Sequence, residues 1–216
     1  MKFGGSMSKE ELLKNVASGR KISEYIEFID NNDLIVYLFN MCEDKKNRLK
    51  YQAEKVIREL SIYNPKILYP YFERMLHFLN GDNKFLRYGF LLTMPNLLCV
   101  DLCNKWAYIR ATYLKFYNSN NVIEFNNCVK GFKEIIKTHR EEELIVIPIL
   151  LDIDNHEFKT EKCNEIAKNT VLECFFNIYE SSNHKEEIMK FVKDNINSNT
   201  PTIRNSVQRF LKKYDK

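Results

Sequence analysis

The sequence predicts an all-α fold built from repeated helical hairpins, and three observations support this prediction. A five-residue phrase recurs as LKYQA at 49–53, LRYGF at 86–90 and IRNSV at 203–207. Each copy has an apolar residue, a cation, two spacers and a second apolar residue, and further apolar residues follow it at helical spacing. The chain contains only six Gly and five Pro, which is too few for an all-β fold with many tight turns.

Two weaker copies of the phrase, FNNCV at 125–129 and CNEIA at 163–167, fill the gap between the second and third strong copies. The second residues of the five copies are separated by 37, 39, 38 and 40 positions. These residues are Lys50, Arg87, Asn126, Asn164 and Arg204. A period in this range is typical of stacked helical hairpins, each of which buries its apolar face against the next.

The phrase resembles the second helix of a HEAT repeat, a helix pair of the ARM/HEAT family. Asp44 and Asp82 precede the first two copies, as is usual in the turn of that family, and Asn199 stands before the last copy. The resemblance covers residues 33 to 214, although two of the five copies have Asn in place of the cation. It implies a right-handed α-α superhelix, a HEAT-like solenoid of about five helical hairpins with an N-terminal helical cap.

The domain organisation follows from the position of the repeats. Residues 1–6 contain Gly-Gly-Ser before a second methionine, Met7, and we interpret them as an expression remnant. We expect 7–216 to form one HEAT-like repeat domain, with cap helices in 7–32 and repeats in 33–216. Ser8 and Glu11 form a capping box for the first cap helix, which should stop near Gly19, and a second cap helix is predicted over 21–30.

The repeats should alternate outer and inner helices. Outer helices are expected at 33–42, 65–79, 102–117, 141–152 and around 188–196, and inner helices at 46–63, 84–98, 122–139, 161–179 and from Pro201 onward. Pro95 should kink or end its helix. The run 144–151 is apolar nearly all round and would also suit a buried strand. We favour a helix because the run is in register with the other outer helices.

Composition narrows the class of protein. Hydrophobic residues make up 44% and charged residues 29% of the chain, so a folded domain is expected rather than disorder. The run 144–151 is the longest uncharged apolar run and is too short to span a bilayer, so we expect no membrane partner. The six cysteines lie mostly on predicted apolar helix faces without C-x-x-C spacing, which indicates reduced core residues and a cytoplasmic location.

We find no catalytic phrase of the hydrolase, P-loop, dinucleotide-binding or zinc-protease type, and we expect a non-enzymatic protein without catalytic residues. The four histidines are scattered at turns and helix ends, where surface positions are expected: His77, His139, His156 and His184. Asp152 and Asp154 could bind a cation, but a solvated turn is the favoured interpretation. We therefore expect no metal and no cofactor.

A second hypothesis comes from the alkylpurine DNA glycosylases built from HEAT-like repeats. Their active sites combine an acidic residue with aromatic walls on the concave surface. Here the stretch 101–110 has Asp101, Trp106 and Arg110 together. It departs from that family because the chain has no second Trp and because Trp106 falls on an outer helix. A DNA-binding or DNA-repair protein is therefore kept as the alternative.

The favoured hypothesis is a binding scaffold that mediates macromolecular interaction through the concave face of the solenoid. Cations project from the predicted inner helices, and we expect Lys55, Arg58, Lys133 and Arg209 to contact a partner. The net charge of +4 permits an acidic protein or a nucleic acid, and we favour a protein. The other interpretation of these cations is a solvated face, with the family's internal Arg paired to a neighbouring turn.

Overall fold

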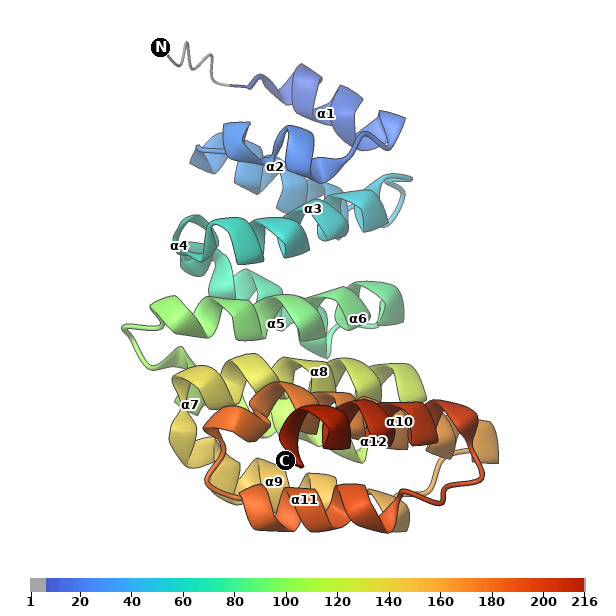
Figure 1. The fold of residues 1–216 in the computed structure, drawn as a ribbon. Coiled ribbons are helices and arrows are strands. Elements are labelled where there is room, and N and C mark those ends of the chain that lie inside the picture. Colours follow the sequence, from blue (N-terminus) through green and yellow to red (C-terminus); the bar gives the residue numbers. More distant parts are fainter. Residues whose placement is uncertain (1–6, 216) are drawn as a thin grey trace. The chain divides into compact units, whose positions relative to one another are not determined.

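The computed structural model describes residues 7–215, so the predicted expression remnant, residues 1–6, lies outside the described residues (Figure 1). Across this range the chain forms twelve α-helices joined by 3₁₀ segments and turns, without a strand. The predicted all-α fold is therefore confirmed. No helix within 7–215 combines the length and the apolar content that crossing a bilayer requires. The chain divides into two compact units, the first ending at Ile109 and the second beginning at Arg110.

The first unit contains the N-terminal cap and two repeats (Figure 1). Its helices are α1 (Lys9–Ser18), α2 (Asn32–Glu43), α3 (Lys50–Tyr63), α4 (Pro65–Leu68), α5 (Phe72–Asn80), α6 (Lys84–Thr93) and the start of α7 (Lys105–Leu114). The predicted capping box opens α1, because Ser8 Oγ accepts a hydrogen bond from the Glu11 N–H at 3.1 Å and the Glu11 carboxylate accepts one from the Ser8 N–H at 2.9 Å. Gly19, with φ of 68°, ends the helix in the left-handed conformation.

The prediction of a continuous cap helix over 21–30 is wrong. The segment forms two 3₁₀ turns, Ile22–Glu24 and Ile26–Phe28, which are separated by Tyr25 at φ −138°. Neither turn has a side-chain cap that would support a helix start. Tyr25 and Ile29 are buried, and the second turn packs on α3. Tertiary packing therefore overrides the helical spacing of the apolar residues.

Prolines decide where several helices of the first unit end. Asn64 ends α3, and Pro65 is the first residue of α4, where a missing N–H costs nothing. The predicted outer helix over 65–79 is interrupted by the 3₁₀ turn Tyr69–Tyr71, which contains Pro70. Pro95 lies in the 3₁₀ segment Met94–Val100 directly after α6, as predicted.

An aromatic core joins the outer and inner helices of the first unit. Phe39 of α2, Phe78 of α5 and Phe90 of α6 are buried and stacked, with ring centroids 4.4 Å apart for Phe78 and Phe90. Helix α3 packs on α2 and on α6, and α5 packs on α6. The outer helices thus cover one side of the α3 and α6 pair, and the other side carries the exposed residues of these helices.

The second unit repeats this arrangement (Figure 1). After the end of α7 its helices are α8 (Val122–Thr138), α9 (Glu143–Leu151), α10 (Glu161–Ile178), α11 (Lys185–Asp194) and α12 (Pro201–Tyr214). The inner helix α10 packs on α8 and on α12, while the outer helices α9 and α11 pack on each other. The helix predicted for 144–151 is confirmed in place of the strand. A single concave face formed by all five inner helices stays a prediction.

Candidate functional site

The cation of the recurrent phrase holds the turn of its own repeat. Arg87 donates hydrogen bonds to the carbonyl oxygens of Leu79, at 3.1 Å from Nε, and of Gly81. Arg204 donates to the Ser198 carbonyl at 2.6 Å from Nη1. The Leu79 carbonyl belongs to the last turn of α5, and the Gly81 and Ser198 carbonyls belong to the segments between outer and inner helices, where backbone groups have few helical partners. In these two copies the Arg therefore helps to fix the turn of its own repeat.

In the other three copies of the phrase, the second residue contacts the preceding turn in a different way or makes no such contact. Lys50 donates from Nζ to the Lys45 carbonyl at 2.7 Å. Asn164 accepts a hydrogen bond instead of donating one, because its Oδ1 binds the Phe158 N–H at 3.1 Å. Asn126 is buried, and its Oδ1 has no hydrogen-bond partner within the described part of the chain. Four of the five copies therefore bind the turn that precedes their inner helix.

In the first unit, the exposed sides of the inner helices carry a group of aromatic and basic residues. We call this group, Tyr51, Lys55, Lys84, Phe85 and Tyr88, the α3–α6 face. Phe85 lies edge-on against Tyr51 and Tyr88, with ring centroids 5.7 and 6.0 Å away. Phe85 is 67% exposed, Tyr51 is 42% exposed and Tyr88 is half-buried. The rings thus pack on one another at the surface rather than in the core.

A glycine explains how α3 and α6 approach closely beneath these rings. A Cβ atom at Gly89 would lie 2.0 Å from Cδ of Glu54, so only glycine leaves room for this carboxylate. Glu54 is 7% exposed and accepts a hydrogen bond from Arg58 Nε at 3.1 Å. Burial raises the pKa of the Glu54 carboxyl, and the charge of Arg58 opposes this shift. The acid of this region is therefore buried, away from the exposed face.

The burial of Glu54 leaves the α3–α6 face basic. Helix α6 contains no acidic residue, and the only other acid of α3 is Glu59. Lys55 and Lys84 are exposed, and neither makes an ion pair with a residue in 7–215. This face therefore combines an aromatic centre with two available ammonium groups.

In the second unit, several cations of the inner helices are bound to acids. Arg209 of α12 forms an ion pair with Glu173 of α10, and its guanidinium lies 4.3 Å from the Phe176 ring centroid. Ser206 donates a hydrogen bond to Glu173 at 3.1 Å. Lys133 of α8 lies 3.5 Å from a carboxylate oxygen of Glu134. The α10–α12 face, defined as Glu173, Phe176, Ser206 and Arg209, is thus a paired network.

The four predicted contact residues are distributed over both units. Lys55 and Arg58 lie on α3, Lys133 on α8 and Arg209 on α12. Only Lys55 among these four has no ion pair with a described residue. Their role in partner binding stays a prediction. Phe85 was not among the predicted contact residues. It lies next to Leu86, and the sequence alone does not show which of two adjacent apolar residues is exposed.

The acid and the indole of the glycosylase hypothesis have structural roles. Asp101 accepts hydrogen bonds from the backbone N–H groups of Lys105 and Trp106, each at 2.8 Å, and from the Tyr69 hydroxyl. The carboxylate therefore caps the first turn of α7. Trp106 is 2% exposed, so its ring packs in the core and offers no wall for a base. The structure does not favour this alternative.

The remaining polar candidates have protein partners. Asp152 accepts a hydrogen bond from Asn155 Nδ2 at 2.5 Å, and Asp154 lies 2.5 Å from Lys168 Nζ. The two carboxylates therefore do not share a cation. Within 7–215 no group of three or more His, Cys, Asp or Glu side chains is placed to hold a metal ion.

The cysteines only partly follow the core prediction. Cys42, Cys128 and Cys174 are buried, and burial raises the pKa of each thiol, to about 12 for Cys174. Cys99 and Cys103, which were also expected in the core, are exposed. Cys99 lies in the 3₁₀ segment that follows Pro95 and Cys103 follows that segment, so neither is part of an α-helix.

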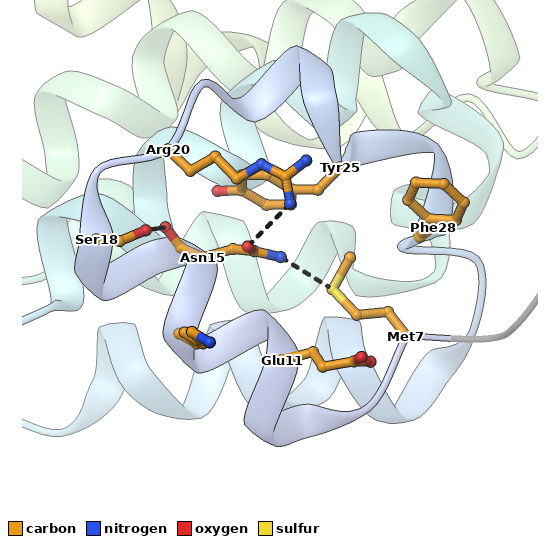
Figure 2. A pocket seen from close by; sticks show the side chains of 8 residues that line it. Met7, Glu11, Asn15, Ser18, Arg20, Tyr25 and Phe28 are labelled. Atoms are coloured by element: carbon orange, nitrogen blue, oxygen red, sulfur yellow. Dashed lines mark hydrogen bonds between the residues drawn. The ribbon is translucent and has the colours of Figure 1, made fainter.

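A hollow of about 550 Å³ lies between α1 and the two 3₁₀ turns that follow it (Figure 2). Its polar groups bind one another: Arg20 donates to Asn15 Oδ1 at 3.3 Å and to the Glu24 carboxylate at 2.9 Å, and Asn15 donates to Met7 Sδ at 3.9 Å. These contacts connect the cap segments. They do not form a nucleophile, base or metal-ligand arrangement.

Comparison with known proteins supports the fold. A designed armadillo repeat protein is similar in structure, with a TM-score of 0.59 and 15% sequence identity over 97% of this chain and 95% of that one. The chain has an armadillo-like (ARM/HEAT) helical repeat fold. No family model matches the sequence, and no curated protein matches it.

Proposed function

We propose that the chain is a non-enzymatic binding scaffold that holds a protein partner on its inner helices. Armadillo-like folds commonly serve as scaffolds, because stacked repeats expose rows of side chains on a rigid support. The observation that carries the proposal is the aromatic group formed by the exposed Tyr51 and Phe85 with the half-buried Tyr88. We therefore propose that the α3–α6 face is the surface that contacts the partner.

Aromatic residues contribute strongly to protein–protein contacts because they bury a large area with little loss of side-chain freedom. On this face the three rings are already fixed by edge-on contacts with each other. A partner that covers Phe85 would therefore gain apolar burial without ordering a flexible side chain. Lys55 and Lys84 beside the rings favour carboxylates in the same partner segment.

The pairing of nearby cations favours a protein over a nucleic acid. Lys50 and Arg87 are bound to turn carbonyls and Arg58 is bound to Glu54, so Lys55 and Lys84 remain. Two ammonium groups are few for a phosphate backbone, which needs a track of cations. The mutual edge-on packing of the rings also reduces the ring faces available for base stacking. The proposed partner segment has an apolar residue flanked by one or two acids.

The predicted contacts in the second unit are left out of this proposal. Lys133 and Arg209 already have acidic partners, so binding a ligand would replace an existing ion pair. We retain Lys55 as the main cationic contact, whereas Arg58, which is also in an ion pair, has no direct part in the proposal. A cytoplasmic location is also proposed, because six free cysteines suit a reducing compartment.

The first test is affinity capture from an extract of the native host, followed by quantification of the captured proteins. We expect Phe85→Ala to reduce capture of a specific partner by about tenfold or more, because it removes a central aromatic contact. Arg209→Ala is the matched control, since Arg209 is also exposed and lies on an inner helix. Equal capture by both variants and the wild type would contradict the proposal.

The second test addresses the nucleic-acid alternative. Binding to duplex DNA is measured over a range of salt concentrations, and the same protein is incubated with alkylated DNA. The proposal predicts weak binding and no base release. Affinity that falls steeply with salt would instead indicate phosphate contacts, because their formation releases counterions. Release of an alkylated base would contradict the non-enzymatic part of the proposal.

A further inference from the structure

The outer helix α9 has an exposed apolar side. The side chain of Leu144 is 71% exposed and that of Ile145 is 39% exposed. Pro148 is also exposed, and Ile149 and Leu151 are half-buried. The spacing from Leu144 to Pro148 and Leu151 places them on one side of the helix. We call these five residues the α9 outer face.

The neighbouring outer helix α11 shows that this face is unusual. The exposed residues of α11 are all charged: Lys185, Glu186, Glu187, Lys190, Lys193 and Asp194. On α9 the core is supplied by other residues, Val146, Ile147 and Leu150, which are fully buried. The apolar residues on the outer side of α9 are therefore not used to form the hydrophobic core. A helix that is apolar on every side is typically buried on every side, so a covering partner is implied.

Uncompensated acids stand at both ends of the α9 outer face. Glu141 precedes the helix and Asp152 follows it, and both are exposed. Neither carboxylate makes an ion pair with a residue in the described range. The nearest cation in sequence, Arg140, is bound to Glu143 at 3.1 Å and to the Ser181 carbonyl. The face is thus apolar in the centre and negative at its two ends.

We propose that the α9 outer face docks a helical segment of a second protein partner whose apolar stripe is flanked by a basic residue at each end. The nine residues of α9 extend over about 14 Å, which suits two to three turns of a partner helix. Charge complementarity decides against a second copy of this chain, because antiparallel pairing of two α9 helices would bring Glu141 against Asp152. The proposal is independent of the α3–α6 face, which lies on other helices and has the opposite charge.

The test uses two fluorescein-labelled helical peptides and the full chain. Both peptides carry the same leucine stripe, and one has lysines at its ends where the other has glutamates. Fluorescence anisotropy should give about tenfold tighter binding for the lysine peptide. The overall charge of the chain is +4, which would favour the glutamate peptide, so this preference reports on a local negative site.

Variants locate the site. Leu144→Gln should weaken binding of the lysine peptide about tenfold without changing Tm, because Leu144 is exposed. The double variant Glu141→Lys, Asp152→Lys should reverse the preference between the peptides. Lys190→Gln, on the outer side of α11, is the matched control and should bind like the wild type.

Three outcomes would overturn the proposal. The first is the absence of binding, or equal binding of the two peptides by the wild type. The second is unchanged binding by Leu144→Gln. The third is concentration-dependent self-association of the chain, measured by sedimentation velocity and abolished by Leu144→Gln, which would show that a second copy covers the face.

Discussion

The α3–α6 face of the first unit and the α10–α12 face of the second unit are built from equivalent inner helices, yet they present opposite surfaces. On the first, the Glu54 carboxylate is buried beside Gly89, and aromatic rings with unpaired lysines are exposed. On the second, Glu173 has a side chain 37% exposed and binds Arg209 at the surface. The two faces therefore differ in where the carboxylate of the inner helix lies, buried on the first face and at the surface on the second.

The largest effect is expected for Gly89→Ala, which tests how the first unit buries its acid. The new Cβ would overlap Glu54 Cδ at 2.0 Å, so the carboxylate must move and its bond to Arg58 must change. We expect the free energy of unfolding to fall by about 3 kcal/mol, the upper part of the range for overpacking. Urea denaturation measures this change.

A double-mutant cycle separates this cause from a general effect of alanine. In the Glu54→Ala background the overlap is absent, so Gly89→Ala should cost little there. Additive effects of the two substitutions would show that the glycine is needed for another reason, and the comparison of the two faces would lose its structural basis.

A smaller effect is expected for Arg87→Ala, which tests a feature that the two units share. The substitution removes the donors for the Leu79 and Gly81 carbonyls, and we expect a loss of about 1–3 kcal/mol. Arg204→Ala removes the donor for the Ser198 carbonyl in the second unit and should cost less. Thermal unfolding of both variants measures the loss. An unchanged Tm for Arg87→Ala would indicate that Arg87 is available to a ligand.

The smallest changes in stability are expected for Glu54→Gln and Glu173→Gln. The first should stabilise the fold at neutral pH, and the second should destabilise it. Burial holds the pKa of Glu54 above its ordinary value of 4.5, so the folded state favours the neutral form. The resulting stabilisation is complete below pH 4.5 and is lost as the pH rises through the raised pKa. Glu54→Gln keeps the neutral form and should unfold at a higher temperature than the wild type at neutral pH. This difference should shrink as the pH falls toward 4.5.

Glu173→Gln supplies the opposite case. It breaks an exposed ion pair with Arg209, so it should lower the free energy of unfolding by less than about 1 kcal/mol at neutral pH. Equal responses of Glu54→Gln and Glu173→Gln across the pH range would contradict the different burial of the two carboxylates.

The helices that carry the recurrent phrase were predictable from sequence because their signals are local. The spacing of Lys50, Arg87 and Arg204 gave the repeat, and Pro65, Pro95 and the capping box at Ser8 marked real helix ends. The segment 21–30 was not predictable in the same way. Its apolar spacing is helical, but burial of Tyr25 and Ile29 is satisfied by two short turns.

The candidate site was only partly predictable because exposure depends on neighbouring helices. Lys55 was correctly expected on an exposed side, whereas Phe85 was missed because Leu86 beside it fills the core. The close approach of Gly89 to Glu54 brings together residues that are 35 positions apart, so no local sequence pattern could predict it. The binding of Arg209 by Glu173 is likewise a contact between separate helices.

Photo-crosslinking in the native host tests the central claim, docking on the α3–α6 face, most directly. Phe85 is replaced by a photoreactive phenylalanine analogue, which keeps the aromatic ring, and Arg209 is replaced in a matched variant. Crosslinked products are then identified by mass spectrometry. We predict a discrete protein adduct from position 85 and none from position 209. Adducts at position 209 alone, or nucleic acid rather than protein at position 85, would contradict the account.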